Sequence, residues 1–187
     1  MKRIPLIVAT LFLVTNLFAQ KENTGTLTRA KTTFGIKAGY NAAQIKIVNE
    51  TSDFVRKESG FYAGAFVNIP TSDIFSVQPE IIYSSSGYDA NNNISLLYLP
   101  ISLRFELAND FTGFIGPEAQ FLIGTDDVET QYFNDVMFGF HFGAAYKITE
   151  NIFVEARPYF AITKLLDNGP GNYRRLNTFH FGLGYQF

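Results

Sequence analysis

The chain has 187 residues, and its 15 Lys and Arg against 17 Asp and Glu give a formal net charge of −2, which offers no strong positive field for nucleic acid. Cysteine is absent, which excludes disulfides, thiolate metal sites and a lipid-anchored cysteine. Aromatic residues make up 16% of the chain, with 20 Phe and 10 Tyr, and this composition favours strands.

The first residues have the pattern of an export signal. Lys2 and Arg3 give a positive start, residues 4–14 are nearly all apolar, and Ala19 is a small residue at the expected cleavage position. The apolar run is too short for a typical membrane-spanning helix, although an uncleaved anchor helix is the alternative. We therefore expect a signal peptide over residues 1–19, followed by a polar periplasmic tether over residues 20–32.

After the tether, eight stretches alternate apolar with small or polar residues, the period of two that is typical of strands. The expected strands are residues 33–47, 59–69, 74–88, 94–107, 111–124, 135–148, 152–165 and 177–187. The segments between them alternate between long and short, with loops expected over residues 48–58, 89–93, 125–134 and 166–175. Membrane barrels have this asymmetry, with longer loops outside and short turns in the periplasm.

Four prolines fall inside the predicted strands, at Pro79, Pro100, Pro117 and Pro158. Proline has no N–H to donate to a neighbouring strand and is rare in central strands. We expect β-bulges at these positions.

The final strand carries the sharpest motif, because every odd position is large and apolar and the chain stops on an aromatic residue. These positions are Phe179, Phe181, Leu183, Tyr185 and Phe187. This ending resembles the C-terminal strand of bacterial outer-membrane barrels, in particular the small eight-stranded group of OmpA/OmpX-like size and PorT-like sequence. The resemblance implies that these five residues are the assembly signal read by the barrel-assembly machinery, and that the protein lies in the outer membrane.

The two faces of the strands differ in kind when the apolar face of each is turned outward. The inward face then receives all the charges of the mid-strand positions, four positive and four negative: Lys37, Glu80, Arg104, Glu106, Glu118, Lys147, Glu155 and Arg157. A lipid-facing surface requires the absence of charge, since Arg or Lys at the bilayer midplane costs roughly 2–4 kcal/mol. We therefore expect an interior charge network inside an all-β, eight-stranded antiparallel up-and-down transmembrane barrel over residues 33–187.

A soluble, exported lipocalin-like binder is the mirror image of this prediction, with the apolar faces lining a pocket. The crowding of Phe and Leu on those faces and the shortage of charges for a solvated exterior favour the membrane barrel.

Residues with catalytic chemistry are few. His141 and His180 are predicted to face inward, Glu118 and Glu155 form a weak carboxylate pair, and Asp126, Asp127 and Glu129 form an acidic loop cluster that could attract a divalent cation. Each has a plainer explanation as a hydrogen-bonded or solvated group, so we expect no catalytic site, no metal and no cofactor.

An eight-stranded barrel has an interior only wide enough for side chains, which argues against a general porin. The sequence thus predicts a closed outer-membrane barrel that contacts membrane lipid and acts as a structural or surface-interaction protein or as an accessory to a secretion complex. The alternative from a different class is an enzyme that modifies outer-membrane lipid.

Overall fold

The computed structural model describes residues 31–49, 52–89, 92–125, 134–167 and 172–187. Its strands are β1 (Thr33–Asn49), β2 (Ser52–Pro70), β3 (Phe75–Asp89), β4 (Asn92–Ala108), β5 (Phe111–Thr125), β6 (Val136–Lys147), β7 (Ile152–Ala161), β8 (Leu166–Asp167) and β9 (Tyr173–Gln186). No helix in these ranges is long and apolar enough to cross a membrane. The predicted signal peptide, most of the predicted tether and the acidic cluster of Asp126, Asp127 and Glu129 lie outside the described residues.

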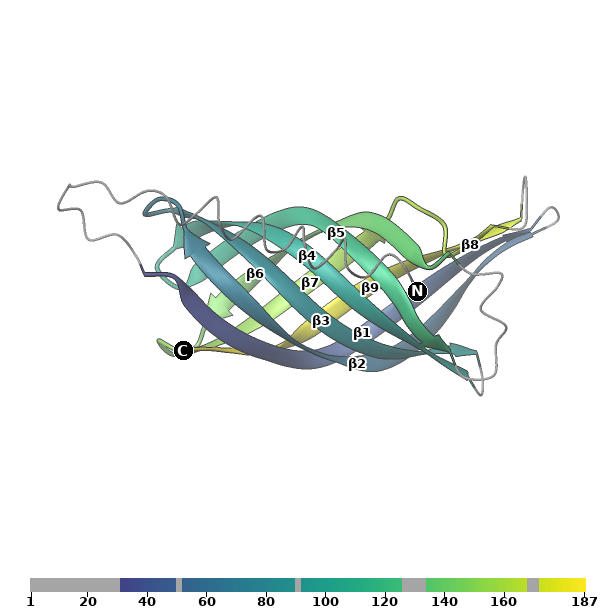
Figure 1. The fold of residues 1–187 in the computed structure, drawn as a ribbon, viewed down its shortest axis with the longest axis horizontal. Helices are drawn as coiled ribbons and strands as arrows, with labels where there is room; N and C mark the ends of the chain where they lie inside the picture. Colours follow the sequence, from purple (N-terminus) through teal and green to yellow (C-terminus); the bar gives the residue numbers. More distant parts are fainter. Residues whose placement is uncertain (1–30, 50–51, 90–91, 126–133, 168–171) are drawn as a thin grey trace, which may run out of the picture.

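The sheet is closed. Each strand from β1 to β6 pairs antiparallel with the next, β7 pairs with β9, and β9 pairs back with β1 (Figure 1). The two-residue β8 adds to the far end of β9 without interrupting the ring. The predicted eight-stranded, all-antiparallel barrel is confirmed.

The two ends of the barrel are distinct. The end that we call the terminus end holds the start of β1 and the last residue, where the Phe187 N–H donates to the Phe34 carbonyl at 2.8 Å. The three turns at this end join β2 to β3, β4 to β5 and β6 to β7. The opposite end, here the loop end, is where the β1–β2 hairpin projects farthest (Figure 1).

Strand alternation divides the side chains into an outward apolar set and an inward set. The outward band runs along β1 from Phe34 to Ala42 and along β9 from Phe179 to Phe187, which in each case matches the ~9–11 residues that a tilted strand needs to cross a bilayer. Large apolar side chains on this band are exposed, up to 75% for Phe61. The exterior of the described barrel is therefore a continuous apolar belt.

The expected loop over residues 48–58 is wrong. β1 and β2 pair without a break from Thr33 opposite Asn68 to Asn49 opposite Ser52, so nearly the whole segment is strand. Its side chains are mostly polar, so the lipid-compatible pattern ends there and the sequence predicts a loop. Backbone pairing continues beyond the bilayer because it does not depend on outward apolar residues. The connection between β3 and β4 is also shorter than expected, which removes the predicted length asymmetry at both places.

The predicted seventh strand, residues 152–165, ends earlier, at Ala161. The N–H groups of Ile162 and Thr163 donate to the Phe138 carbonyl at 2.9 and 3.1 Å, which turns the chain off the barrel wall. Leu165 and Leu166 then enter the barrel mouth and are buried. Part of the loop predicted over residues 166–175 is strand, since β8 and the start of β9 lie within it.

The expectation of bulges at the four prolines is also wrong. The register shifts lie at Gly87/Asp89, Ser95/Leu96 and Glu106/Ala108, away from every proline. Pairing on both sides of Pro79 and Pro100 keeps the same register, as in Pro79 opposite Ile101 and Ile82 opposite Tyr98. A proline removes one donor, and the strand absorbs that loss without an extra residue.

Candidate functional site: the barrel interior

Six of the eight charges predicted to face inward are buried in the interior. They are Lys37, Glu80, Arg104, Glu118, Glu155 and Arg157. Glu106 and Lys147 are instead exposed at the terminus end, where they line a small opening with Arg104 and Thr112. The expectation that these two belong to a buried network is wrong, because each lies near the end of its strand within reach of water. The buried set holds three cations and three anions.

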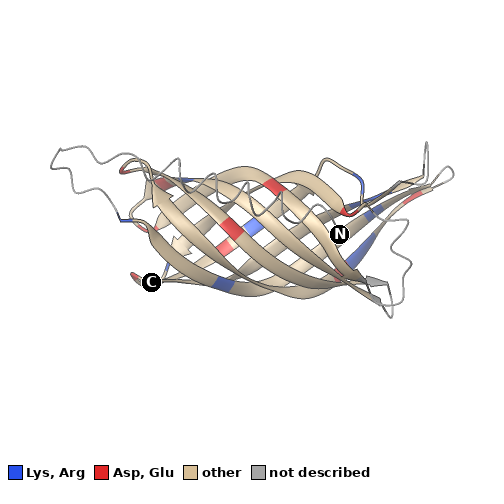
Figure 2. Cartoon of the chain, in the orientation of Figure 1, with Lys and Arg blue, Asp and Glu red and all other residues tan. Residues whose placement is uncertain are grey.

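Arg157 and Glu80 form the centre of this network. Arg157 Nη1 donates to Glu80 Oε2 at 2.9 Å, and Nη2 donates to Oε1 at 2.7 Å, a bidentate pair. Arg157 is 0% exposed, so its charge depends on these partners. Figure 2 shows acidic and basic segments side by side in the middle of the barrel.

Glu155 is the second anion of the centre and contacts three cations. Its Oε1 lies 3.0 Å from Lys37 Nζ and 2.9 Å from Arg157 Nη2, and its Oε2 lies 3.7 Å from Arg104 Nη1. Lys37 Nζ also lies 2.8 Å from Glu80 Oε2, so it joins the two carboxylates. Side chains from β1, β3, β4 and β7 are thereby connected across the lumen.

A polar layer next to this centre contains Ser102, His141 and Glu118 in an order that resembles a Ser–His–acid triad. Ser102 Oγ lies 2.9 Å from His141 Nε2, and His141 Nδ1 lies 3.3 Å from Glu118 Oε2. Ser102 Oγ also donates to Glu80 Oε1 at 3.1 Å. An ionised carboxylate only accepts, so the serine proton points to Glu80 and the histidine Nε2–H must be the donor to Ser102.

That arrangement opposes nucleophilic catalysis. A histidine that donates to the serine cannot take its proton, and Ser102 and His141 are both 0% exposed. Glu118 also accepts a hydrogen bond from Gln120 Nε2 at 2.8 Å. The three residues therefore extend the interior hydrogen-bond network, as expected from the sequence for His141, whereas the buried ring nitrogens of His180 have no hydrogen-bond partner.

His180 lies in a second layer, between two tyrosine rings. Its imidazole stacks on Tyr62 with ring centroids 4.7 Å apart and on Tyr98 with centroids 5.4 Å apart. This position explains why an inward histidine sits on the last strand: a flat ring fills the slot between two others. Asn41, on the inward face of β1, donates from its side-chain amide to the hydroxyls of Ser84 and Ser86 at 2.8 Å each.

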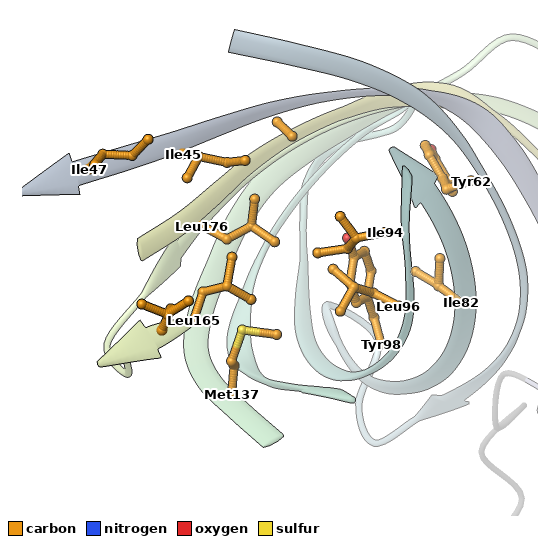
Figure 3. Close-up of a cluster of buried hydrophobic side chains, with 12 residues drawn as sticks. Ile45, Ile47, Tyr62, Ile82, Ile94, Leu96, Tyr98, Met137, Leu165 and Leu176 are labelled. Atoms are coloured by element: carbon orange, nitrogen blue, oxygen red, sulfur yellow. The ribbon is translucent and has the colours of Figure 1, made fainter. Parts of the chain in front are cut away.

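Apolar layers close the polar centre on both sides, which the sequence analysis did not foresee. Towards the terminus end, Phe66, Phe114, Phe153 and Ala145 form one buried cluster. Towards the loop end, a larger cluster fills the mouth (Figure 3), and its members are Ala43, Ile45, Ile47, Tyr62, Ile82, Ile94, Leu96, Tyr98, Met137, Leu165, Leu166 and Leu176. The signal for it was present in the inward Ile45 and Ile47 of β1, which break the rule that inward residues are polar.

The aromatic rings of the terminus-end layer also make cation–π contacts with the buried cations. The Arg157 guanidinium lies 5.1 Å from the centroid of the Phe114 ring, and that of Arg104 lies 5.5 Å from the same centroid. Lys37 Nζ lies 5.7 Å from the Phe66 ring centroid. Cations stacked on aromatic faces recover part of the solvation that burial removes.

Inward glycines make room for these rings. A Cβ added at Gly184 would overlap the Phe153 ring, and one added at Gly35 would overlap the Phe66 ring. Small residues alternate with the outward aromatics of β9 for this reason. The glycines of the final strand are therefore packing positions, in addition to allowing a tightly curved wall.

The described residues contain no group of three His, Cys, Asp or Glu that could hold a metal ion. Glu118 and Glu155, which the sequence suggested as a carboxylate pair, are each occupied by other partners. The residues of the expected assembly signal, Phe179, Phe181, Leu183, Tyr185 and Phe187, all lie on the outward face of β9 or just after it.

An interior of paired charges under an apolar exterior is the inverse of a soluble ligand-binding barrel, so the lipocalin-like alternative is wrong. The fold and its surface define an integral outer-membrane β-barrel. The chain matches the outer membrane protein beta-barrel domain over residues 18–167, and it belongs to that family. The comparison with curated proteins gave no match.

Solved structures show the same fold at low sequence identity. Ail, the attachment invasion locus protein of Yersinia pestis, aligns with a TM-score of 0.54 at 13% identity, covering 84% of this chain and 100% of Ail. Neisserial surface protein A aligns with a TM-score of 0.52 at 14% identity, covering 84% of this chain and 100% of that protein. Ail in complex with the heparin analogue sucrose octasulfate aligns at 0.50, with 13% identity and coverage of 84% and 100%.

Proposed function

We propose that the protein is a non-conducting outer-membrane barrel that anchors in lipid and presents its loop end for contact with other molecules, as a surface-interaction protein or as an accessory to a secretion complex. The observation that carries this proposal is the bidentate Arg157–Glu80 pair, which crosses the lumen at its centre. A channel for solutes needs a wetted path at that level, and the pair occupies it.

The apolar layers support the same conclusion. The cluster with Ile45, Leu96 and Leu165 fills the loop end, and the one with Phe66, Phe114 and Phe153 fills the terminus end. A solute would have to displace both layers and separate buried charges. We infer that such a barrel functions through the molecules that contact its outer surface.

The β1–β2 hairpin extends beyond the lipid band. β1 has 17 residues and β2 has 19, well above the ~9–11 that a membrane crossing needs. The names of two solved neighbours describe an attachment invasion locus protein and a surface protein. Ail was also captured with a heparin analogue. These similarities support a role at the cell surface for this chain.

The barrel-assembly machinery is the expected partner during biogenesis, through the outward aromatics of the last strand. Phe179, Phe181, Leu183, Tyr185 and Phe187 remain exposed in the folded barrel. The same residues contact lipid once assembly is complete.

The test of the closed interior is a conductance measurement on protein folded in planar bilayers. Wild-type protein, with its folded state checked by heat modifiability on a gel, should give no steady porin-sized current. A stable large current from the wild type would overturn the proposal.

Display of the hairpin at the cell surface is tested by inserting an epitope between residues 50 and 51 and labelling intact cells with an antibody against it. The absence of labelling, with the barrel assembled normally, would contradict the proposal.

The proposal excludes lipid-modifying catalysis by the interior histidines. His180→Ala and Ser102→Ala should leave the mass spectrum of outer-membrane lipid A species unchanged from that of cells with the wild-type protein. Loss of one lipid A species in either variant, with the barrel still assembled, would support the enzymatic alternative.

A further inference from the structure

The lumen ends in a small polar opening at the terminus end. Its volume is about 100 Å³, the space of roughly three water molecules, and its wall includes Phe153 of the aromatic layer. Side chains near the ends of β2, β4, β5, β6, β7 and β9 line it. We infer that this opening binds a short zwitterion, a molecule of the amino-acid kind that carries an ammonium and a carboxylate on a few carbon atoms.

The charges around the opening are the first argument. Two cations, Arg104 and Lys147, and two carboxylates, Glu106 and Glu150, line it. In the part of the chain that the structure describes, no ion pair joins either cation to either carboxylate. The Glu106 carboxylate instead accepts a hydrogen bond from Thr112 Oγ1 at 3.1 Å. Opposite charges that line one space without pairing are complementary to a ligand that carries both signs, whereas a lone anion would meet as many like charges as opposite ones.

Arg104 is the inner cation of the opening. The residue is 8% exposed, and its guanidinium lies 5.9 Å from the centroid of the Phe153 ring. The Glu155 Oε2 atom lies 3.7 Å from Arg104 Nη1, which is too long for a hydrogen bond, and Nη1 has no other hydrogen-bond partner. The other oxygen of Glu155 lies within 3.0 Å of both Lys37 Nζ and Arg157 Nη2. Because a guanidinium is a planar fork of donors that matches a carboxylate, a ligand carboxylate in the opening would give Arg104 the acceptor that Glu155 does not provide.

Other groups of the lining suit the ammonium of such a ligand. The Oδ1 atom of Asn68 is buried without a hydrogen-bond partner, and the carboxylates of Glu106 and Glu150 are exposed. An ammonium has donors only, so it requires oxygen acceptors of this kind. The lining therefore offers acceptors for an ammonium as well as donors for a carboxylate.

The aromatic layer limits the length of the ligand. The rings of Phe66, Phe114 and Phe153 form a buried cluster behind the opening, so only a short molecule or the end of a longer one fits. The opening lies inside the ring of strands and therefore away from the lipid-facing wall. It is also at the opposite end of the barrel from the loops of the proposed function, so either proposal can fail without the other.

The test is a titration of isotope-labelled protein, folded in a nonionic detergent and followed by NMR of its backbone amides. The probes are glycine, acetate and methylammonium, compared at one ionic strength. Glycine should shift the amide signals of Thr112, Ala145 and Gln186, which line the opening, and leave that of Gly60 near the loop end unchanged. An exposed ion pair contributes roughly two- to fivefold to binding, so glycine should bind about two- to fivefold more tightly than acetate or methylammonium.

Variants of the lining separate this site from a general effect of charge. Lys147→Gln and Glu150→Gln alter exposed residues, and each should weaken glycine binding by roughly two- to fivefold. Arg104→Gln removes a buried charged donor and should weaken it about tenfold or more. The matched control is Lys46→Gln with Asp53→Asn, a pair at the loop end with side chains 48% and 55% exposed, which should bind glycine as the wild type does. Heat modifiability shows whether each variant is folded, and the two exposed variants decide the test if Arg104→Gln does not fold.

Three results would overturn the inference. Acetate or methylammonium could bind as tightly as glycine, which would define a site for a single charge. Lys147→Gln and Glu150→Gln could bind glycine as tightly as the loop-end control does. The shifts could appear at both ends of the barrel and rise without saturation, which would mean that glycine acts through the solvent and not at a site.

Discussion

The guanidinium of Arg157 on β7 forms two parallel hydrogen bonds with the carboxylate of Glu80 on β3, at 2.9 and 2.7 Å. In the closed order β1-β2-β3-β4-β5-β6-β7-β9, these strands are four steps apart in either direction, so the pair joins opposite walls. Neighbouring strands are held by the backbone. Opposite walls are held by this pair and by the groups that surround it.

Arg157→Ala should lower the free energy of unfolding by about 3 kcal/mol, the lower part of the range for breaking a buried ion pair. The reason is that Glu80 keeps Lys37 at 2.8 Å, so it is not left wholly unpaired. The measurement is urea unfolding of protein folded in lipid vesicles, followed by tyrosine fluorescence. Lys147→Ala, at an exposed position, is the control and should change stability by less than 0.5 kcal/mol or so. Equal effects would mean that the interior is well hydrated.

Gly184→Ala should destabilise the barrel by roughly 1–3 kcal/mol, the usual cost of overpacking. The added methyl group would overlap the Phe153 ring, which is itself enclosed by Phe66 at a centroid distance of 5.7 Å. Gly124→Ala is the matched control, because its new Cβ would lie 3.8 Å from the nearest atom, Ser95 Cβ. The same unfolding assay applies. If the glycines differ little, Phe153 can move aside and the terminus-end layer is looser than its packing suggests.

The sequence was sufficient to predict the ring of strands because every outward-facing position within the membrane must satisfy one condition, contact with lipid. Phe179 to Phe187 shows that condition directly, and the same period identified the other strands. Where lipid contact ends, the condition ends too, and the continuation of the hairpin over residues 48–49 and 52–58 could not be predicted.

The interior was harder to predict because its residues satisfy several conditions at once. Alternation placed Lys37, Glu80 and Arg157 inside, but the choice of partners depends on stagger between strands, which periodicity does not contain. Leu165 is the clearest failure: in the chain it continues a strand pattern, whereas in the fold it leaves the wall and is fully buried in the mouth. A side chain that closes the barrel from a loop carries no periodic signal.

The N-terminal pattern predicts export with cleavage after Ala19, because a charged start and a short apolar run precede that small residue. Mature protein purified from outer membranes should begin at Gln20 when its N-terminus is sequenced. A start at Met1 in such preparations would contradict the prediction and favour an uncleaved anchor.

Phe140→Arg should impair assembly into the membrane, since it places a charge on the lipid-facing wall. Phe140 is exposed on β6 and stacks on Phe160 of β7 with ring centroids 5.5 Å apart. Arg or Lys on the lipid face costs roughly 2–4 kcal/mol at the midplane and less near the interfaces. The measurement is the fraction of heat-modifiable, folded protein recovered from outer membranes.

The control for this prediction is Asn109→Arg, in the exposed turn between β4 and β5, which should assemble as the wild type does. Depth supplies a second comparison. Phe140 and Phe142 lie on either side of the middle of the outward face of β6, so Phe142→Arg should reduce the folded fraction about as much. If both Phe variants assembled as well as Asn109→Arg, the apolar wall would not be in contact with lipid. If Phe140→Arg were the more severe of the two, the band would be centred closer to the loop end.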